Sequence, residues 1–369
     1  MPVGTTIWAV ATITNSESRR LVIVAGAGAS RKLGKEEDMP LMTDWARLLV
    51  SDLEQAVPGA AAAIGLRQDM DGEQFEEALG TFLRWQQVFH LTERFQRLGG
   101  PQPGQGTGEV EAWVGRSSQR SAAIKEVLNE SMFTHFGGGM LDADKAKRVY
   151  RALDGVIGER SVQKICATTN YDLALEKGFS AIGYRVEDGI GQAQNWAPWT
   201  FDASHLGNWE EIGSESVNVL HLHGTVGWYR REDRVMRMPD MEKYNPTLGD
   251  PVFLPPDPDK DPLNEAIVQG LWSAFESALE GATHVLVVGH SLHDRTLVAA
   301  LNRASQHASI VIASRKPTNL NLKLIPKATP AVIEISPEVP PPSWLGSWID
   351  GQDPPAVPRK IERPGTQGQ

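Results

Sequence analysis

The chain has 369 residues, of which 41% are hydrophobic and 22% are charged, a composition that supports a globular protein with a large core. The formal net charge of -10 argues against nonspecific electrostatic binding to the phosphate backbone of nucleic acids. The single cysteine excludes an internal disulfide framework and a zinc site built from several thiolates. We therefore expect a cytoplasmic protein that does not bind nucleic acid directly.

The sequence also argues against association with a membrane. No uncharged apolar run approaches the length of a spanning helix, and the mildly apolar first residues lack the basic start of a secretion signal. We therefore expect no membrane segment.

Four apolar runs, each ending in small or polar residues, predict buried strands of a parallel sheet. They are LVIVAGAGAS at 21–30, VQKICATTNYD at 162–172, VNVLHLHG at 217–224 and THVLVVGHS at 283–291. Open α/β sheets bind ligands at the carboxyl ends of their strands. The runs therefore predict one site at that edge of a Rossmann-like sheet with helices on both faces.

Between Gly34 and Gly158 the apolar spacing becomes helical, as in EQFEEALGTFLRWQQVFHLTERFQRL, whereas residues 99–111 are rich in glycine and proline and predict a loop. Three domain ranges follow from these changes. They are 1–34 with 158–336 for the α/β domain, 35–157 for a helical insertion, and 337–369 for a proline-rich tail. We expect Trp344 and Trp348 of the tail to dock on the body.

The turn GAGAS follows the first predicted strand. Gly26 and Gly28 would let the backbone approach a pyrophosphate, while the next helix supplies N–H donors at its N-terminus. Arg31 stands where the dinucleotide fingerprint has its third glycine. A purely structural turn is therefore the alternative.

Two later motifs offer polar side chains at strand ends. In TTNYD, Asn170 can orient a ribose hydroxyl or a water, and the alternative is a turn in which Asn170 and Asp172 cap the next helix. In HLHG, His221 and His223 share one face of a strand by its period of two. We expect His221 in the sheet interior and His223, next to a glycine, as a base that titrates near neutral pH.

The last motif, VVGHSLHD, places Gly289, Ser291 and Asp294 after a buried strand, where small residues allow a ribose to approach closely. A hydrolase nucleophile elbow does not fit, because His293 occupies the position of its second glycine.

In this order, GAGAS, TTNYD, HLHG and VVGHSLHD resemble the sirtuin superfamily, whose members bind NAD between a Rossmann-like sheet and a smaller module. The motifs are most similar to the branch of sirtuin-like NAD hydrolases of bacterial antiphage defence. Deacetylating sirtuins carry a four-cysteine zinc module, which a chain with one cysteine lacks. The helical insertion also fits this zinc-less branch, in which helices cover the cofactor cleft.

The resemblance implies that NAD is the substrate, that no zinc is needed, and that the products are nicotinamide and ADP-ribose. It assigns Asn170 and His223 to catalysis. The residues it assigns to NAD binding are Gly26, Ala27, Gly28, Ser30, Asp172, Gly289 and Ser291. It also implies a regulatory partner, such as an ATPase, an Argonaute-like protein or another sensor, and a homo-oligomer.

Two other functions remain open from the residues. One is a metal-dependent hydrolase in which His221 and His223 are ligands, a reading that metal removal would test. The other is a non-enzymatic sensor that binds NAD or ADP-ribose, which a nicotinamide-release assay would separate from an enzyme.

Overall fold

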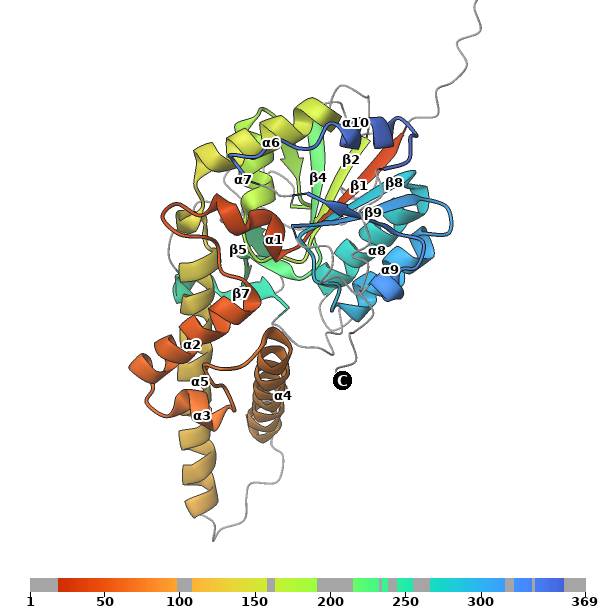
Figure 1. The fold of residues 1–369 in the computed structure, drawn as a ribbon. Helices are drawn as coiled ribbons and strands as arrows, with labels where there is room; N and C mark the ends of the chain where they lie inside the picture. The colour runs from red at the N-terminus through yellow and green to blue at the C-terminus, as the bar shows by residue number, and fades with distance from the viewer. Residues whose placement is uncertain are drawn as a thin grey trace, which may run out of the picture.

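A parallel sheet of seven strands forms the centre of the molecule (Figure 1). The computed structural model describes residues 19–97, 108–157, 163–190, 215–231, 234–237, 244–254, 266–315, 322–333 and 336–354. The strand order is β10-β9-β8-β1-β2-β4-β3. The strands are β1 (Arg20–Ala25), β2 (Gln163–Thr168), β3 (Arg185–Glu187), β4 (Ser216–His221), β8 (His284–Val288), β9 (Ser309–Ser314) and β10 (Thr329–Val332). The predicted Rossmann-like sheet is confirmed, and the four apolar runs form β1, β2, β4 and β8.

Helices cover both faces of this sheet because its strands alternate their side chains between two apolar layers. On β1, Leu21 and Ile23 join one buried cluster, whereas Val22 and Val24 join the other. The first layer contains α6 (Ala143–Ile157), α7 (Ala174–Ala181) and α10 (Trp344–Ile349). The second contains α8 (Ala266–Gly281) and α9 (Arg295–Ala304), on the other side of the sheet in Figure 1.

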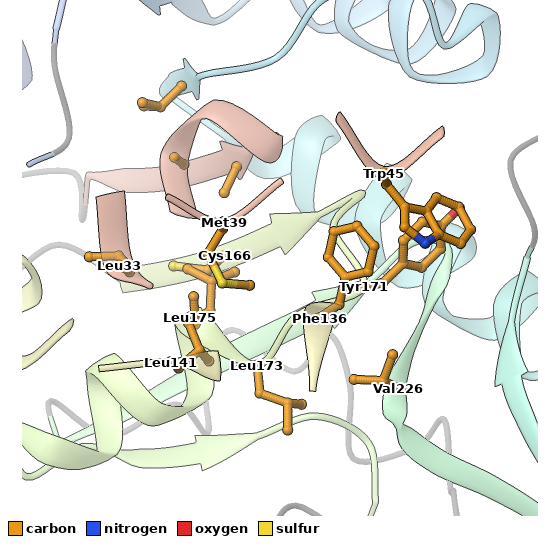
Figure 2. Close-up of a cluster of buried hydrophobic side chains, with 14 of the residues drawn as sticks. Leu33, Met39, Trp45, Phe136, Leu141, Cys166, Tyr171, Leu173, Leu175 and Val226 are labelled. Atoms are coloured by element: carbon orange, nitrogen blue, oxygen red, sulfur yellow. The ribbon is translucent and has the colours of Figure 1, made fainter. Parts of the chain in front are cut away.

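The helical insertion extends away from the sheet (Figure 1). Its helices are α2 (Met42–Ala56), α3 (Ala60–Ala63), α4 (Gly72–Arg97) and α5 (Gly108–Phe136). Trp45 joins them, because its ring lies 5.3 Å from that of Phe75 and 5.6 Å from that of Phe136. Phe136 in turn lies beside Tyr171, which follows β2 (Figure 2). The aromatic cluster thus joins the insertion to the carboxyl edge of the sheet.

Two boundaries differ from those predicted for the insertion. Helix α6 packs against α7 and α10 over the sheet, so the covering layer of the α/β domain begins before residue 158. Residues 108–111 of the expected loop are the start of α5, and its residues 99–107 lie outside the described ranges.

A second, antiparallel sheet of three strands was not predicted. Its order is β6-β5-β7, with β5 (Gly224–Arg231), β6 (Arg234–Arg237) and β7 (Asp250–Phe253). It begins at Gly224, the last residue of HLHG, whose φ of +73° reverses the chain in a conformation that favours glycine. A Cβ at this position would lie 2.3 Å from the Val252 carbonyl oxygen, so the space beside Gly224 is filled by β7.

The C-terminal tail docks on the body through the predicted tryptophan pair. Trp348 is buried, and its Nε1 donates to the Ser309 hydroxyl at 2.9 Å, while Trp344 packs on the same cluster. The remaining short helices are α1 (Ala27–Ser30) and the 3-10 turns Arg31–Leu33, Gly138–Met140, Pro246–Leu248 and Leu322–Leu324. Across the described ranges, no helix combines the length and the apolar character that crossing a membrane requires.

Candidate functional site

A cavity of about 720 Å³ opens at the carboxyl edge of the parallel sheet. It lies where the chain order reverses, because β2 and β8 flank β1 on opposite sides, and such switch points bind ligands in α/β sheets. Residues from all four predicted motifs line it, namely Ala27, Gly28, Ser30, Asn170, Asp172, His223, Gly289 and Ser291. Gly26 is the one predicted site residue that is not part of the lining. Parts of α2 and α4 and the end of α5 close the cavity from the side of the insertion.

The glycines of GAGAS hold two loops together. Gly26 donates its N–H to the Val288 carbonyl at 2.9 Å, and Gly28 donates to the Gly289 carbonyl at 3.0 Å. A Cβ on Gly28 would lie 3.0 Å from Gly289 Cα, so these two backbones touch. The N–H groups of Gly26 and Gly28 are therefore engaged within the protein. The following α1 has only four residues, too few for the long helix dipole that the motif suggested.

Ser30, Asn170 and Asp172 form a buried hydrogen-bond network beneath the cavity. The Asn170 amide nitrogen donates to the Gly26 carbonyl and to the Ser30 hydroxyl, both at 3.1 Å. Because both amide protons are engaged, Oδ1 is the atom with which Asn170 can meet a ligand, as an acceptor. The Ser30 hydroxyl donates to Asp172 Oδ2 at 2.7 Å.

Asp172 ties this network to the helix that follows. Its Oδ1 accepts the Ala174 N–H at 2.9 Å, so the turn that was weighed as an alternative for TTNYD does exist alongside the cavity. Burial raises the pKa of Asp172, although the Ser30 hydroxyl and the Ala174 N–H stabilise its carboxylate.

His223 lines the cavity and is paired with a carboxylate. Its Nε2 lies 2.8 Å from Asp294 Oδ2, and its ring lies 6.4 Å from that of Tyr171. Asp294 also accepts the Leu297 N–H through Oδ1 at 2.9 Å, which caps α9. With Nε2 donating to the carboxylate, Nδ1 is the basic nitrogen of this imidazole. The sequence placed Asp294 near the site, but nothing in it indicated this pairing.

His221 lies in the sheet interior, as expected. Its Nε2 is bonded to the Glu176 carboxylate, and among the described residues its Nδ1 has no hydrogen-bond partner. Burial alone would lower the pKa of His221, but the charge and hydrogen bond of Glu176, together with the charges of Asp188 and Asp172, outweigh burial and the pKa is raised. Since His221 does not line the cavity, the two histidines of HLHG do not converge on one point. In the described part of the chain, no three His, Cys, Asp or Glu side chains are placed to hold a metal.

The turn after β8 is conformationally strained. Leu292 has a φ of +63°, the one positive value among described residues other than glycine, and its N–H is held by His290 Nδ1 at 2.8 Å. This turn sets Ser291 on the cavity wall and Asp294 against His223. Backbone strain of this kind is often found at functional sites.

Basic side chains that sequence reasoning missed also line the cavity. Arg31 and Lys32 contact Asp38, at 3.3 and 2.9 Å. Arg295 begins α9 and Arg315 follows β9, and neither has an ion-pair or hydrogen-bond partner among the described residues. The Lys and Arg residues that follow VVGHSLHD in the sequence could have indicated this basic part of the cavity.

Comparisons with known proteins give one family match and a set of structural matches. The model of the SIR2-like domain matches residues 164–321. Among solved structures, one described as "Structural Basis for the Mechanism and Regulation of Sir2 Enzymes" is 13% identical, with a TM-score of 0.42, and the match covers 91% of this chain and 93% of that one. Another, "The Structural basis for Sirtuin Substrate affinity", is 13% identical with a TM-score of 0.37 and the same coverage. No curated protein matches the sequence.

Proposed function

Since residues 164–321 match the model of the SIR2-like domain, we propose that this chain is an NAD glycohydrolase. The observation that carries the proposal is the convergence of Asn170 and His223 on one cavity at the switch point of the sheet. That cavity has the size of a small-molecule site and is bounded on one side by helices of the insertion.

The reaction requires positioning more than acid catalysis. In NAD the leaving nicotinamide carries a positive ring nitrogen, which becomes neutral when the bond to ribose breaks and the electron pair stays on nitrogen. A water oxygen bonds to the ribose carbon, and its proton leaves. Asn170 Oδ1 would orient that water or a ribose hydroxyl as an acceptor, and His223 Nδ1 would take the proton. The products are nicotinamide and ADP-ribose.

The other binding residues follow from their places on the cavity wall. Ala27, Gly28 and Ser30 would contact the diphosphate and the nearby ribose, and Asp172 would hold Ser30 in place. Gly289 and Ser291 would hold the adenosine half, because they follow β8, which lies on the opposite side of β1 from β2 and Asn170. Gly26 would act indirectly, by joining the loops after β1 and β8.

The biological role that we propose is depletion of NAD in antiphage defence, under the control of a regulatory protein. Its support is the order of the four motifs, which is similar to that branch of sirtuin-like hydrolases. An ATPase, an Argonaute-like protein or another sensor would release the activity, in the cytoplasm and through a homo-oligomer. The His223→Ala variant described next also tests this role, by NAD measurement in infected cells.

The enzymatic proposal is tested with Asn170→Ala and His223→Ala. Each should reduce nicotinamide release from NAD by about 100-fold or more, as expected when positioning or general-base help is lost, while NAD affinity changes little. His307→Ala is the matched control, since His307 contacts the Leu279 carbonyl away from the cavity and should keep full turnover. His221→Ala should lower the melting temperature more than it lowers turnover.

Different results would point to different functions. Near-normal turnover in His223→Ala, with a folded but inactive His221→Ala, would contradict the choice of catalytic histidine. Nicotinamide release that requires an acyl-lysine peptide would identify a deacylase. Tight NAD binding without any release, with the regulatory protein present, would identify a sensor.

A further inference from the structure

The charge of the cavity changes from one end to the other. From Arg295 to Ile333 the sequence has six Lys and Arg residues and no Asp or Glu, in a chain whose net charge is -10. This segment contains α9, β9 and β10, which form the β8 side of the cavity edge. Apart from Asp294, the lining carboxylates belong instead to the insertion and to the loop after β2, namely Asp71, Glu73, Glu76 and Asp172.

Two of these cations, Arg295 and Arg315, are on the cavity wall, and no described side chain neutralises them. Within the described ranges neither guanidinium has an ion-pair partner, whereas Arg31 and Lys32 on the same wall contact Asp38. The lining carboxylate that precedes Arg295 in the sequence, Asp294, is committed to His223 and to the Leu297 N–H. This end of the cavity therefore offers two guanidinium groups and no unengaged described carboxylate.

A ribose hydroxyl and a phosphate are bound by side chains of opposite charge. In dinucleotide sites a carboxylate accepts from the free 2′-hydroxyl of the adenosine ribose, and an arginine accommodates a 2′-phosphate. Guanidinium groups bind phosphate oxygens through charge-assisted, often paired hydrogen bonds. If the nicotinamide end lies at Asn170 and His223, the adenosine ribose falls on the side of Ser291 and Arg315.

We propose that the site accepts the 2′-phosphorylated dinucleotide NADP, with Arg295 and Arg315 binding the 2′-phosphate. The inference rests on the proposed function for the orientation of the dinucleotide. Hydrolysis would be the same: a water oxygen bonds to the ribose carbon, the bond to nicotinamide breaks with its electron pair on nitrogen, and the proton passes through His223 to solvent. The products would be nicotinamide and 2′-phospho-ADP-ribose.

The test measures binding of mononucleotides that have no nicotinamide bond, so that it does not depend on catalysis. By calorimetry, the full chain should bind adenosine 2′,5′-bisphosphate about tenfold more tightly than adenosine 5′-monophosphate or adenosine 3′,5′-bisphosphate. Arg295→Ala and Arg315→Ala should remove most of this preference and leave the affinity for the monophosphate nearly unchanged. Arg303→Ala, which removes an exposed charge from the same helix, should keep the preference.

Three results would overturn the inference. They are equal binding of the three nucleotides by the wild-type chain, equal binding of the 2′ and 3′ bisphosphates, and an equal loss for all nucleotides in the Arg295 and Arg315 variants. The last would mean that the arginines bind the 5′-phosphate. Nicotinamide release from NAD, measured on the same preparation, reports separately on the proposed function.

Discussion

At the residue scale, Asp294 has two separate tasks. One carboxylate oxygen caps α9 and the other holds His223, so the position of the imidazole is tied to the start of a helix. A carboxylate on Nε2 also favours the tautomer whose Nδ1 is the base. Asp294 is therefore a positioning residue, and its charge matters to catalysis while its hydrogen-bond acceptor matters to stability.

Asp294→Asn separates these tasks. The amide oxygen can still cap α9, so the melting temperature should stay close to that of the wild type. The amide nitrogen would donate to His223 Nε2 and so favour the opposite tautomer, and turnover should fall by about 100-fold. The measurement is the pH profile of kcat/KM for nicotinamide release, together with thermal unfolding. Unchanged turnover and pH profile would assign Asp294 to the helix cap alone.

The residues of the site differ in how far the sequence could place them. Asn170 and His223 could be placed because each directly follows an apolar strand, and strand ends share one edge. The Asp294 pairing joins positions 71 residues apart, and it depends on a turn through the left-handed Leu292. The local sequence pattern could not predict this turn, because leucine rarely adopts the left-handed backbone conformation.

At the scale of elements, the contact between the loops after β1 and β8 defines the floor of the cavity. Gly289 has a φ of +65°, and a Cβ there would lie 2.4 Å from the Ala29 nitrogen. The backbones of GAGAS and VVGHSLHD touch at these glycines, so neither loop has room for a side chain there. Spacing within one motif could suggest a tight turn, but it could not reveal that the partner backbone comes from the other motif.

Gly289→Ala tests this contact, with Gly65→Ala as the matched control. Both glycines have positive φ, but a Cβ on Gly65 would have no atom within 4 Å. Gly65→Ala should therefore cost only the strain of the left-handed conformation, about 1 to 2 kcal/mol. Gly289→Ala should cost more in denaturant unfolding and should also weaken NAD binding, because both loops must shift. Equal costs for the two variants would show that the loops can separate freely.

The elements themselves were predictable to different degrees. Long apolar runs identified β1, β2, β4 and β8, because a strand buried on both faces needs them. The small antiparallel sheet escaped prediction, since β6 and β7 have only four residues each and depend on pairing with β5. The helix expected after the first strand is present as α1, a single turn that contacts Gly289.

At the scale of the whole molecule, buried ion pairs join separate elements, and one of them connects the two sheets. His221 at the end of β4 pairs with Glu176 of α7, and Asp188 pairs with Arg237 of β6 at 2.9 Å. Burial raises the pKa of Asp188 although Arg237 opposes this effect. Removing one partner of a buried pair leaves an uncompensated group, which typically costs about 3 to 5 kcal/mol.

Glu176→Gln should therefore destabilise the protein and change its response to pH. The raised pKa of His221 means that its pair stabilises the fold fully below the unfolded value of about 6.5. This contribution is lost as pH rises through the folded pKa. The free energy of unfolding of the wild type should thus fall above pH of about 6.5, and the fall should be smaller in Glu176→Gln. Glu280→Gln, an exposed change on α8, is the control. The same slope in all three proteins would exclude His221 as its source.

The pairing of β1 with β8 also has a consequence for the newly made protein. Val24 lies beside Val287 in the sheet, and Gly26 reaches Val288, although some 260 residues of synthesis separate them. Contacts of such long sequence separation form late, because most of the chain must emerge before its ends can meet. The floor of the cavity cannot exist on the ribosome until β8 has been translated. A nascent chain that stops before that point would leave the cell's dinucleotide pool untouched.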